Sequence, residues 1–359
     1  MGIVIAILAF CFMILIHEWG HFIVARKNGV FVQEFAFGMG PKIVSHISKK
    51  SGTEYSWRLF PIGGFCSMLG EDEPSEEAGS FSQKSVWARL AIVAAGPLMN
   101  ILTAFVLSIV LLIMSGYYTT EVRSVTPGTS AAASGMEAGD SIIKVDGKRI
   151  HTYQDLSYIM MDIGERPIEV ELKKADGTVK TVTLTPRYDE EEGRYLMGIT
   201  VGADYLGWSD AIARGESVWS LAGGTVSQAF WQLRSNVQLV IRSFVQLVTG
   251  QVSFSNVMGP IGIVQVMDES VSEASAYGFK AVLQSILSLT VLLSVNLGIM
   301  NLFPIPALDG SHIVFLLIEA VRKKPVSKKV ESIVYLVGFI LLILLMVAVA
   351  FQDILRIIG

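Results

Sequence analysis

The stretch at residues 2–25 reads GIVIAILAFCFMILIHEWGHFIVA and decides the class of this 359-residue chain. It is apolar until it turns polar at His17-Glu18, and Arg26-Lys27 follows it directly. A helix needs about 20 apolar residues to cross the hydrocarbon of a bilayer. A secretory signal peptide would carry a basic segment before the run and a small-residue cleavage site after it, and neither is present. We therefore expect a first membrane span with polar residues in it.

Three further segments are long and apolar enough to be spans. They are residues 90–114, residues 281–302 with a continuation at 313–320 past a proline-rich break, and residues 333–351. Hydrophobic residues make up 52% of the chain and charged residues only 17%, whereas soluble domains carry about 25% charged residues. We predict a polytopic α-helical membrane protein with four transmembrane helices, a membrane-associated β region and one inserted β-rich domain.

Basic residues predict the orientation of these spans. Five of the eight residues at 322–329, between the last two spans, are Lys or Arg. Short loops rich in Lys and Arg stay in the cytosol. The loop between the first two spans is also basic, so both loops are expected on the cytosolic side. The long segment between the second and third spans, and both termini, are then outside.

Net charge and cysteine content exclude other classes. A net charge of −4 argues against a nucleic-acid-binding protein, which usually has a strong basic excess. Cys11 and Cys66 are too few for a disulfide framework, and Cys11 falls inside an apolar run. We expect both to be small buried hydrophobic residues.

The motif His17-Glu18-Trp19-Gly20-His21 has H-E-x-x-H spacing. Positions i and i+4 share one face of a helix, so two imidazoles can reach one zinc ion and the glutamate can reach a bound water. A charged residue at the centre of a span costs about 2.5–3.5 kcal/mol on insertion scales, so such residues are usually functional. The alternative is a group of polar residues at a helix end near the membrane interface.

A catalytic zinc site needs a third protein ligand and an open position. The candidate is Asp309, which follows a break at Pro304 and Pro306 and precedes Gly310. Proline breaks a helix because it has no backbone N–H to donate. A carboxylate in an interrupted span needs a partner, and a metal supplies one. The alternative is that Asp309 only caps the helix that follows.

Residues 119–201 read as a small β-rich domain. Strand-like patterns occur at 122–125, 141–145, 168–173 and 178–185, and a helix is expected at 152–162 with Thr152 as its N-cap. The runs PGTSAA at 127–132 and GMEAGDSIIKVDG at 135–147 resemble a PDZ domain of the permuted bacterial kind. The resemblance implies that Leu196 and Gly198 lie in a substrate-binding loop. The alternative is a steric plug that binds no peptide.

Two other regions flank the predicted spans. Residues 26–88 contain four strand-like segments separated by Gly and Pro, which suggests hairpins beside the first span. An extended substrate would complete their open edge in a membrane; alternatively, the hairpin is cytosolic and touches no substrate. Residues 202–280 carry Trp208, Trp219 and Trp231 at helical apolar spacing. We expect amphipathic helices on the outer membrane surface, or else helices buried against the β-rich domain.

Together these features resemble the site-2 protease family of intramembrane metalloproteases, in its bacterial RseP-type branch. The resemblance rests on the motif at 17–21, on GPLMN at 96–100, on the PDZ-like insertion, and on NLFPIPALDG at 301–310. It covers nearly the whole chain. Some members of that family have two PDZ domains, whereas this chain has room for one.

The resemblance implies a cofactor and a role for each motif residue. Zn2+ would be bound by His17, His21 and Asp309, with Glu18 as the general base. From the residue types, Asn301 is expected to donate to the developing oxyanion, and Asn100 to hold either the substrate or the backbone of the site. For both asparagines the alternative is to satisfy backbone groups freed by the neighbouring prolines.

The function expected from these features is intramembrane cleavage of transmembrane segments of single-span proteins, after a first extracytoplasmic cut. Anti-sigma factors, signal-peptide remnants and pheromone precursors fit as substrates, and the expected location is the bacterial inner membrane, in contact with lipid. A PDZ-bearing scaffold with a vestigial metal site is one alternative, and a metal transporter is another. The expected domain limits are 1–25, 26–88, 89–114, 119–201, 202–280, 281–320 and 333–356.

Overall fold

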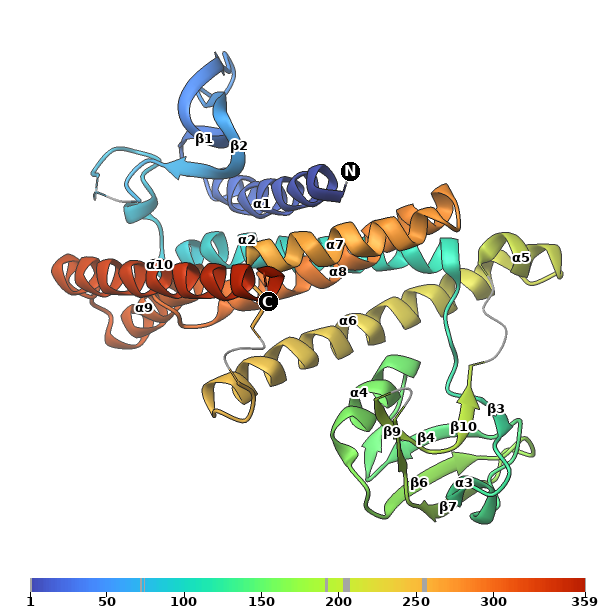
Figure 1. Ribbon diagram of the computed structural model, residues 1–359. Helices are drawn as coiled ribbons and strands as arrows, with labels where there is room; N and C mark the ends of the chain where they lie inside the picture. Colours follow the sequence, from blue (N-terminus) through green and yellow to red (C-terminus); the bar gives the residue numbers. More distant parts are fainter. Residues whose placement is uncertain are drawn as a thin grey trace. The chain divides into compact units, whose positions relative to one another are not determined.

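The computed structural model describes residues 2–71, 73, 75–190, 193–202, 207–253 and 257–358. The chain forms two compact units, one of Met1–Val106 with Val240–Gly359 and one of Leu107–Leu239. Figure 1 shows both units and labels many of their helices and strands. The first unit contains most of the long apolar helices, and the second contains the β-rich domain.

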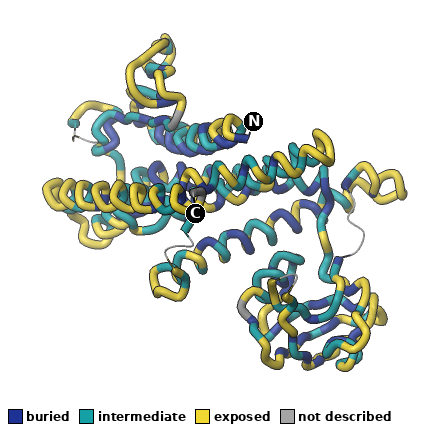
Figure 2. The backbone as a smooth tube through the Cα atoms, in the orientation of Figure 1, coloured by how far each residue is buried: buried dark blue, intermediate teal, exposed yellow. Residues whose placement is uncertain are grey.

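Four helices are long and apolar enough to cross a membrane, judged by length and composition. They are α1 (Gly2–Lys27), α2 (Val86–Ser115), α8 (Phe279–Leu302) and α10 (Lys328–Ile358). Figure 2 shows exposed residues along much of α10. Many of these are large and apolar, among them Leu336, Phe339, Leu341 and Leu344. An apolar surface of this extent suits lipid rather than water.

The predicted third span consists of two helices. α8 ends at Leu302, and α9 begins seven residues later and covers Asp309–Arg322. Between them, Ala307 has a left-handed backbone with φ of +73°. Pro304 and Pro306 cause the break because neither can donate a helical hydrogen bond.

The region after α1 is one long, bent hairpin. β1 (Val32–Ile47) and β2 (Glu54–Met68) pair antiparallel, and the register shifts repeatedly along them. Glu34 pairs with both Ser67 and Glu54, so the first half of β1 has a neighbour on each side. The four strand-like segments of the sequence are thus two strands that fold back on each other.

The hairpin is joined to the helices by a buried apolar cluster. After β2 the chain forms η1 (Phe81–Gln83) and then enters α2. Val32, Met68 and Phe81 are buried together with Ile92 of α2 and Leu316 of α9. This cluster fixes the strands against the helices that carry the candidate site.

The β-rich domain contains eight strands among the described residues of its unit. They are β3 (Val122–Val125), β4 (Ser141–Val145), β5 (Lys148–Arg149), β6 (Ile168–Lys173), β7 (Val179–Leu184), β8 (Arg187–Asp189), β9 (Arg194–Leu196) and β10 (Ile199–Val201). The largest sheet has the order β5-β4-β6-β7, and β10 pairs with β3 and β8 with β9. Two helices complete the domain, α3 (Ser130–Ala133) and α4 (Tyr153–Ile163). The strand and helix predictions for this segment are confirmed to within a residue or two.

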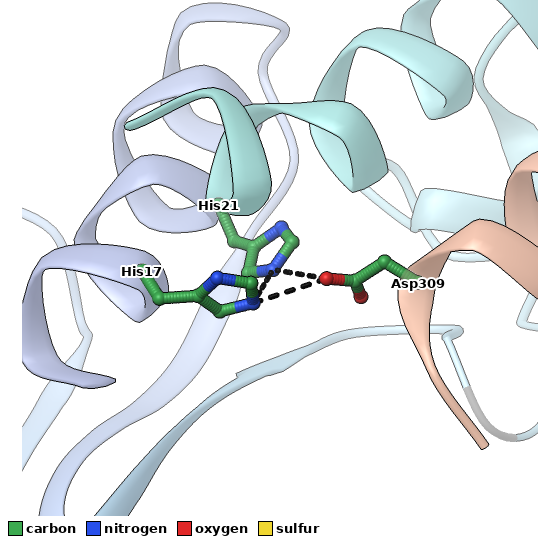
Figure 3. Close-up of side chains that lie close together, drawn as sticks. All are labelled: His17, His21 and Asp309. Carbon is green, nitrogen blue, oxygen red and sulfur yellow. Dashed lines mark hydrogen bonds and ion pairs between the residues drawn. The ribbon is translucent and has the colours of Figure 1, made fainter. Parts of the chain in front are cut away.

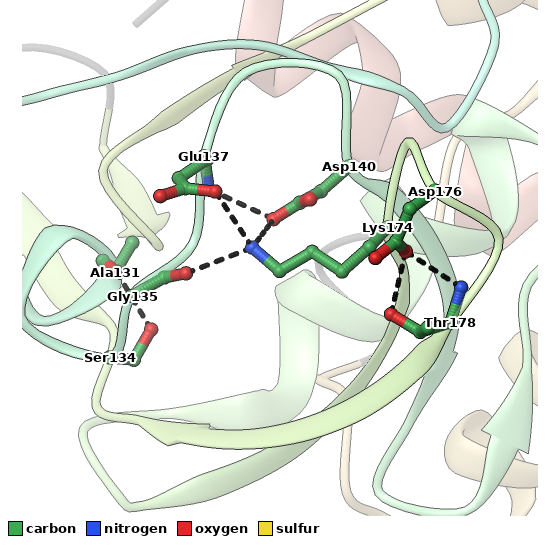
Figure 4. Close-up of polar contacts among 8 residues, drawn as sticks. All are labelled: Ala131, Ser134, Gly135, Glu137, Asp140, Lys174, Asp176 and Thr178. Carbon is green, nitrogen blue, oxygen red and sulfur yellow. Dashed lines mark hydrogen bonds and ion pairs between the residues drawn. The ribbon is translucent and has the colours of Figure 1, made fainter.

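Three hydrogen bonds of Lys174 stabilise one edge of this domain. Lys174 Nζ donates to Asp140 Oδ2 (3.0 Å), to the Gly135 carbonyl (3.1 Å) and to Glu137 Oε2 (3.2 Å), as Figure 4 shows. The Asp140 side chain is almost fully buried, and it raises the pKa of Lys174 by accepting this hydrogen bond. The contact ties the loop before β4 to the end of β6.

Three helices occupy the segment after the β-rich domain. They are α5 (Trp208–Ala213), α6 (Val218–Val248) and α7 (Pro260–Ser275). α7 packs on α1 and α8. Asp268 of α7 accepts the Gly2 N–H at 2.8 Å, and Asp353 of α10 accepts the N–H groups of Gly259 and Gly262 at the start of α7. α7 is therefore tied to two of the long helices by buried or half-buried carboxylates.

Candidate metal centre

The two histidines of the sequence motif lie on one face of α1. His17 and His21 are separated by one helical turn, and both side chains are buried. Their Nε2 atoms lie 3.2 Å apart. Figure 3 shows both rings directed at one point. Two buried imidazole nitrogens at this separation are arranged to share a cation or a proton.

The third group comes from α9, nearly three hundred residues later in the chain. Asp309 Oδ2 lies 3.0 Å from His17 Nε2 and 3.6 Å from His21 Nε2 (Figure 3). Asp309 is the first residue of α9, and the N-cap position is held by Leu308, which makes no side-chain cap hydrogen bond. The carboxylate therefore faces the histidines and does not cap the helix.

The donor set fits a zinc ion. Ligands at about 2.0–2.1 Å from a tetrahedral ion are separated from one another by about 3.3 Å. The three separations here, 3.0, 3.2 and 3.6 Å, lie around that value. Among the described residues, His17, His21 and Asp309 form the cluster able to hold a metal. Three protein ligands leave one tetrahedral position open, as catalytic zinc sites require.

α2 provides the groups behind the histidines. His21 Nδ1 lies 2.9 Å from the Ile92 carbonyl oxygen, and the Asn100 side-chain amide lies 3.2 Å from His17 Nδ1. A carbonyl oxygen facing Nδ1 accepts a hydrogen bond from Nδ1–H and leaves Nε2 free to bind a metal. For His21 this is the tautomer that the zinc assignment needs.

Glycines allow the two helices to come this close. A Cβ atom on Gly96 of α2 would lie 2.2 Å from His21 Nε2 and 2.8 Å from His17 Nε2. A Cβ atom on Gly20 of α1 would lie 2.4 Å from the Ala95 carbonyl oxygen. Real Cβ atoms are not found at such distances, so both positions need glycine for the site to form as it does.

Glu18 lies where the helix meets the hairpin. The backbone amide of Cys66 in β2 hydrogen-bonds to its carboxylate. A Cβ atom on the nearby Gly64 would lie 3.7 Å from Glu18 Cγ, in ordinary contact. Glu18 follows His17 directly in α1, so it lies beside the metal cluster. The hydrogen bond from β2 holds its carboxylate in place.

Comparison with known proteins identifies the family. The model of peptidase family M50 matches residues 5–345. The chain belongs to peptidase family M50, the site-2 proteases.

Relatives of this M50 peptidase match it along almost its whole length. It is similar to a provisionally named zinc metalloprotease of Clostridium perfringens, 38% identical over 358 residues that cover 99% of this chain and 98% of that protein. One from Clostridium acetobutylicum is 36% identical over 353 residues, covering 98% and 97%. Zinc metalloprotease RasP of Geobacillus kaustophilus is 28% identical over 434 residues, also covering 98% and 97%.

Similarity to solved structures is seen in the PDZ domains of bacterial proteins, which match part of the chain. The PDZ domain of the SdrC-like protein from Listeria monocytogenes covers 24% of this chain and 88% of its own, at 23% identity and a TM-score of 0.22. Family membership and the full-length relatives establish that this M50 peptidase is a zinc metalloprotease.

The other predicted residues of this M50 peptidase are placed as follows. Asn301 is half-buried in the last turn of α8. Asn100 has no exposed surface, and its amide lies on His17, so the geometry favours a role toward the histidine over the expected contact with substrate. In the β-rich domain, Leu196 lines a cleft of about 510 Å3 together with Tyr153 and Met160 of α4. Gly198 does not line that cleft and packs against Thr129.

Three contacts of the M50 site escaped the sequence reasoning. They are the Ile92 carbonyl behind His21, the Cys66 amide on Glu18, and the space kept by Gly96. The GPLMN run contains Gly96 and Asn100 four residues apart, which places them on one helix face. In the sequence, that spacing is the signal that indicates this face of α2.

Proposed function

We propose that this M50 peptidase cleaves transmembrane segments of single-span membrane proteins, with zinc bound by His17, His21 and Asp309 inside the bilayer. The observation that carries this proposal is the convergence of three ligand atoms on one point, two of them on α1, a helix apolar enough to span a membrane. Glu18 beside that point supplies the base that hydrolysis needs.

The chemistry follows from these residue types. A zinc ion in such a site lowers the pKa of a bound water toward about 7 and polarises the scissile carbonyl. Glu18 takes the proton of the attacking water and later gives it to the leaving amine. Asn301, in the last turn of α8, is the candidate donor to the developing oxyanion. The side chains of His17 and His21 are buried, which keeps them from bulk water.

The hairpin is suited to hold the substrate in an extended form. A transmembrane helix shields its peptide bonds, so it must unwind locally before hydrolysis. Residues 64–68 of β2 pair with the first half of β1 and run past Glu18. No second strand among the described residues pairs with the other side of residues 64–68. An unwound substrate adding there as a strand would satisfy its backbone and present a peptide bond to Glu18.

The β-rich domain is proposed to select substrates outside the membrane. Its strand order and its cleft between α4 and β9 support a PDZ-type fold. The basic residues at 322–329 support a cytosolic position for the loop between α9 and α10, and an extracytoplasmic one for the β-rich domain. We propose a bacterial inner-membrane location and substrates that have already lost a bulky ectodomain.

Replacement of the base tests this function directly. Glu18→Gln keeps the size of the side chain and removes the proton acceptor. We expect cleavage of a model transmembrane substrate to fall by at least about 100-fold, the low end of what general bases contribute, while zinc content stays at the wild-type level. Glu165→Gln, an exposed position in the β-rich domain, is the matched control. Full activity of Glu18→Gln in purified protein would contradict the proposed role.

A further inference from the structure

Asn100 is a buried polar residue beside the metal cluster that the proposed mechanism does not use. It lies on α2 with an exposed fraction of 0%, and its amide is 3.2 Å from His17 Nδ1. Nδ2 faces the ring, and Oδ1 is buried without a hydrogen-bond partner among the described residues. A fully buried amide is expected to form hydrogen bonds. Either the Nδ2 group or the Oδ1 atom of Asn100 can face the ring of His17.

The chemistry of His17 decides which end of the amide must face it. Its Nε2 is the atom that lies close to Asp309 and to His21, so Nε2 must be free of hydrogen to bind a cation. The proton of the neutral ring is then on Nδ1, which is a donor. An Nδ2 group facing it would set donor against donor. Rotation of the amide by 180°, which exchanges two groups of nearly equal shape, brings Oδ1 to the ring instead.

Either orientation leaves one end of the Asn100 amide without a partner among the described residues, so the hydrogen-bonding requirement of His17 decides between them. The hydrogen bond that positions the metal-binding ring contributes more free energy than a hydrogen bond that only satisfies one end of the amide. Removal of the hydrogen-bond partner of a metal ligand typically lowers metal affinity by about 10–100-fold.

His21 provides an internal comparison. Its Nδ1 already faces an acceptor, the Ile92 carbonyl oxygen at 2.9 Å. Ile92, Gly96 and Asn100 follow one another at intervals of four residues, so they share one face of α2. That face offers a backbone acceptor to one histidine, space for both rings at Gly96, and a side-chain acceptor to the other.

Asn100 is itself held in place by α8. Ser294 Oγ donates to the Asn100 carbonyl oxygen at 2.9 Å, and this contact is buried. A Cβ atom on Gly298, one turn later, would lie 2.9 Å from the Pro97 carbonyl oxygen and 3.4 Å from Asn100 Cβ. α8 therefore packs closely against this part of α2 and fixes the backbone from which the amide projects.

We propose that Asn100 is a positioning residue, whose Oδ1 accepts the Nδ1–H of His17 and so holds the tautomer in which Nε2 binds the metal. This inference rests on the proposed ligand set. It replaces the expected contact of Asn100 with substrate by a contact with the metal-binding ring.

The test is zinc affinity, measured on the purified full-length protein by competition with a chelator. Asn100→Leu keeps a similar volume and removes the acceptor, so zinc binding should weaken by about 10–100-fold. Asn100→Asp keeps an acceptor oxygen facing Nδ1 and should retain zinc affinity at or above the wild-type value. A merely structural role for Asn100 would not give this rescue, because a buried carboxylate fits a packing role worse than leucine does.

Two further variants keep the result interpretable. Ser294→Ala removes the hydrogen bond to the Asn100 backbone but keeps the amide, and it should weaken zinc binding far less than Asn100→Leu. Asn100→Ala is the second acceptor-free variant if Asn100→Leu does not fold. Wild-type affinity in the folded acceptor-free variant, or an Asn100→Asp variant as weak as it, would overturn the inference.

His17→Ala separates this inference from the proposed function. If His17→Ala loses zinc while the acceptor-free variant binds as wild type, the role of Asn100 fails and the ligand set stands. If His17→Ala keeps its zinc, the ligand set itself fails.

Discussion

At the level of single residues, the candidate site depends most on Asp309, because it alone joins α9 to the two histidines of α1. Asp309→Ala removes one of three ligands. Loss of the hydrogen-bond partner of a ligand already lowers metal affinity by about 10–100-fold. Loss of the ligand itself should therefore lower zinc affinity by more than about 100-fold. Zinc stoichiometry after dialysis against a chelator measures this. Asp210→Ala, an exposed position in α5, is the control. Unchanged stoichiometry in Asp309→Ala would remove Asp309 from the ligand set.

Gly96 carries a second prediction at this scale. Alanine there would place Cβ 2.2 Å from His21 Nε2 and 2.8 Å from His17 Nε2, so the rings or the helix must move. Gly96→Ala should therefore lower zinc affinity by at least about 10-fold, the effect of disturbing a group behind the ligands. Gly223→Ala is the matched control, since a Cβ atom in that helical position meets nothing within 4 Å. Equal zinc affinity in both variants would show that α1 and α2 are packed less closely than described.

The sequence predicted the motif residues of the site but not their surroundings. His17, Glu18 and His21 follow from helical spacing within five residues, and Asp309 from a carboxylate beside a proline break. The Ile92 carbonyl contact depends on where α1 crosses α2. No local pattern encodes that crossing, because it arises from the packing of helices far apart in the chain.

At the level of elements, α4 and α6 meet through a short polar and aromatic interface. The ring of His151 stacks on Trp231 of α6 at 3.5 Å between centroids and 3° between planes. Thr152 and Asp155 form a capping box at the start of α4. Ser235 of α6 donates to the other oxygen of Asp155, so the cap of one helix is also a docking point for the next.

His151 predicts a pH dependence for this interface. Burial, aided by Arg234 and Arg149, lowers its pKa below the ordinary 6.5, although Asp155 opposes the shift. The fold thus favours the neutral ring. Its contribution to stability is complete above about pH 6.5 and is lost as the pH falls through the lower folded-state pKa. Thermal unfolding followed by tryptophan fluorescence between pH 5 and 7 should show this loss in the wild type and less of it in His151→Phe. Equal slopes would exclude His151 as the cause.

Strand and helix positions in the β-rich domain were predictable because local signals agree there. Turn residues, alternating strands and the Thr152 cap all lie close in sequence to what they determine. The hairpin was harder. Its four strand-like segments are two bent strands with shifted register, and β1 pairs with both halves of β2. Glu34 and its neighbours in β1 pair with residues in both halves of β2, and this sets the register. Alternation of polar and apolar residues alone does not predict these pairings.

At the level of the whole molecule, the zinc cluster and the β-rich domain belong to different compact units. His17, His21 and Asp309 all lie in the unit formed by Met1–Val106 and Val240–Gly359, as does Glu18. Catalysis and substrate selection are therefore expected to be separable by mutation. The proposed selection acts by size, and the alternative is recognition of a peptide in the cleft beside α4.

Replacement of residues 119–201 by a short flexible linker tests this separation. The variant should keep zinc and should cleave a bare transmembrane substrate at about the wild-type rate, because the three proposed ligands and Glu18 lie outside the replaced residues. It should also cleave the same span carrying an intact ectodomain, which the wild type should reject. Met161→Arg, at an exposed residue lining the cleft, changes the cleft and keeps the domain. Selection by size predicts that Met161→Arg still rejects the ectodomain-bearing substrate. If Met161→Arg instead slows cleavage of substrates that the wild type accepts, the cleft binds peptide, and rejection by size alone is wrong.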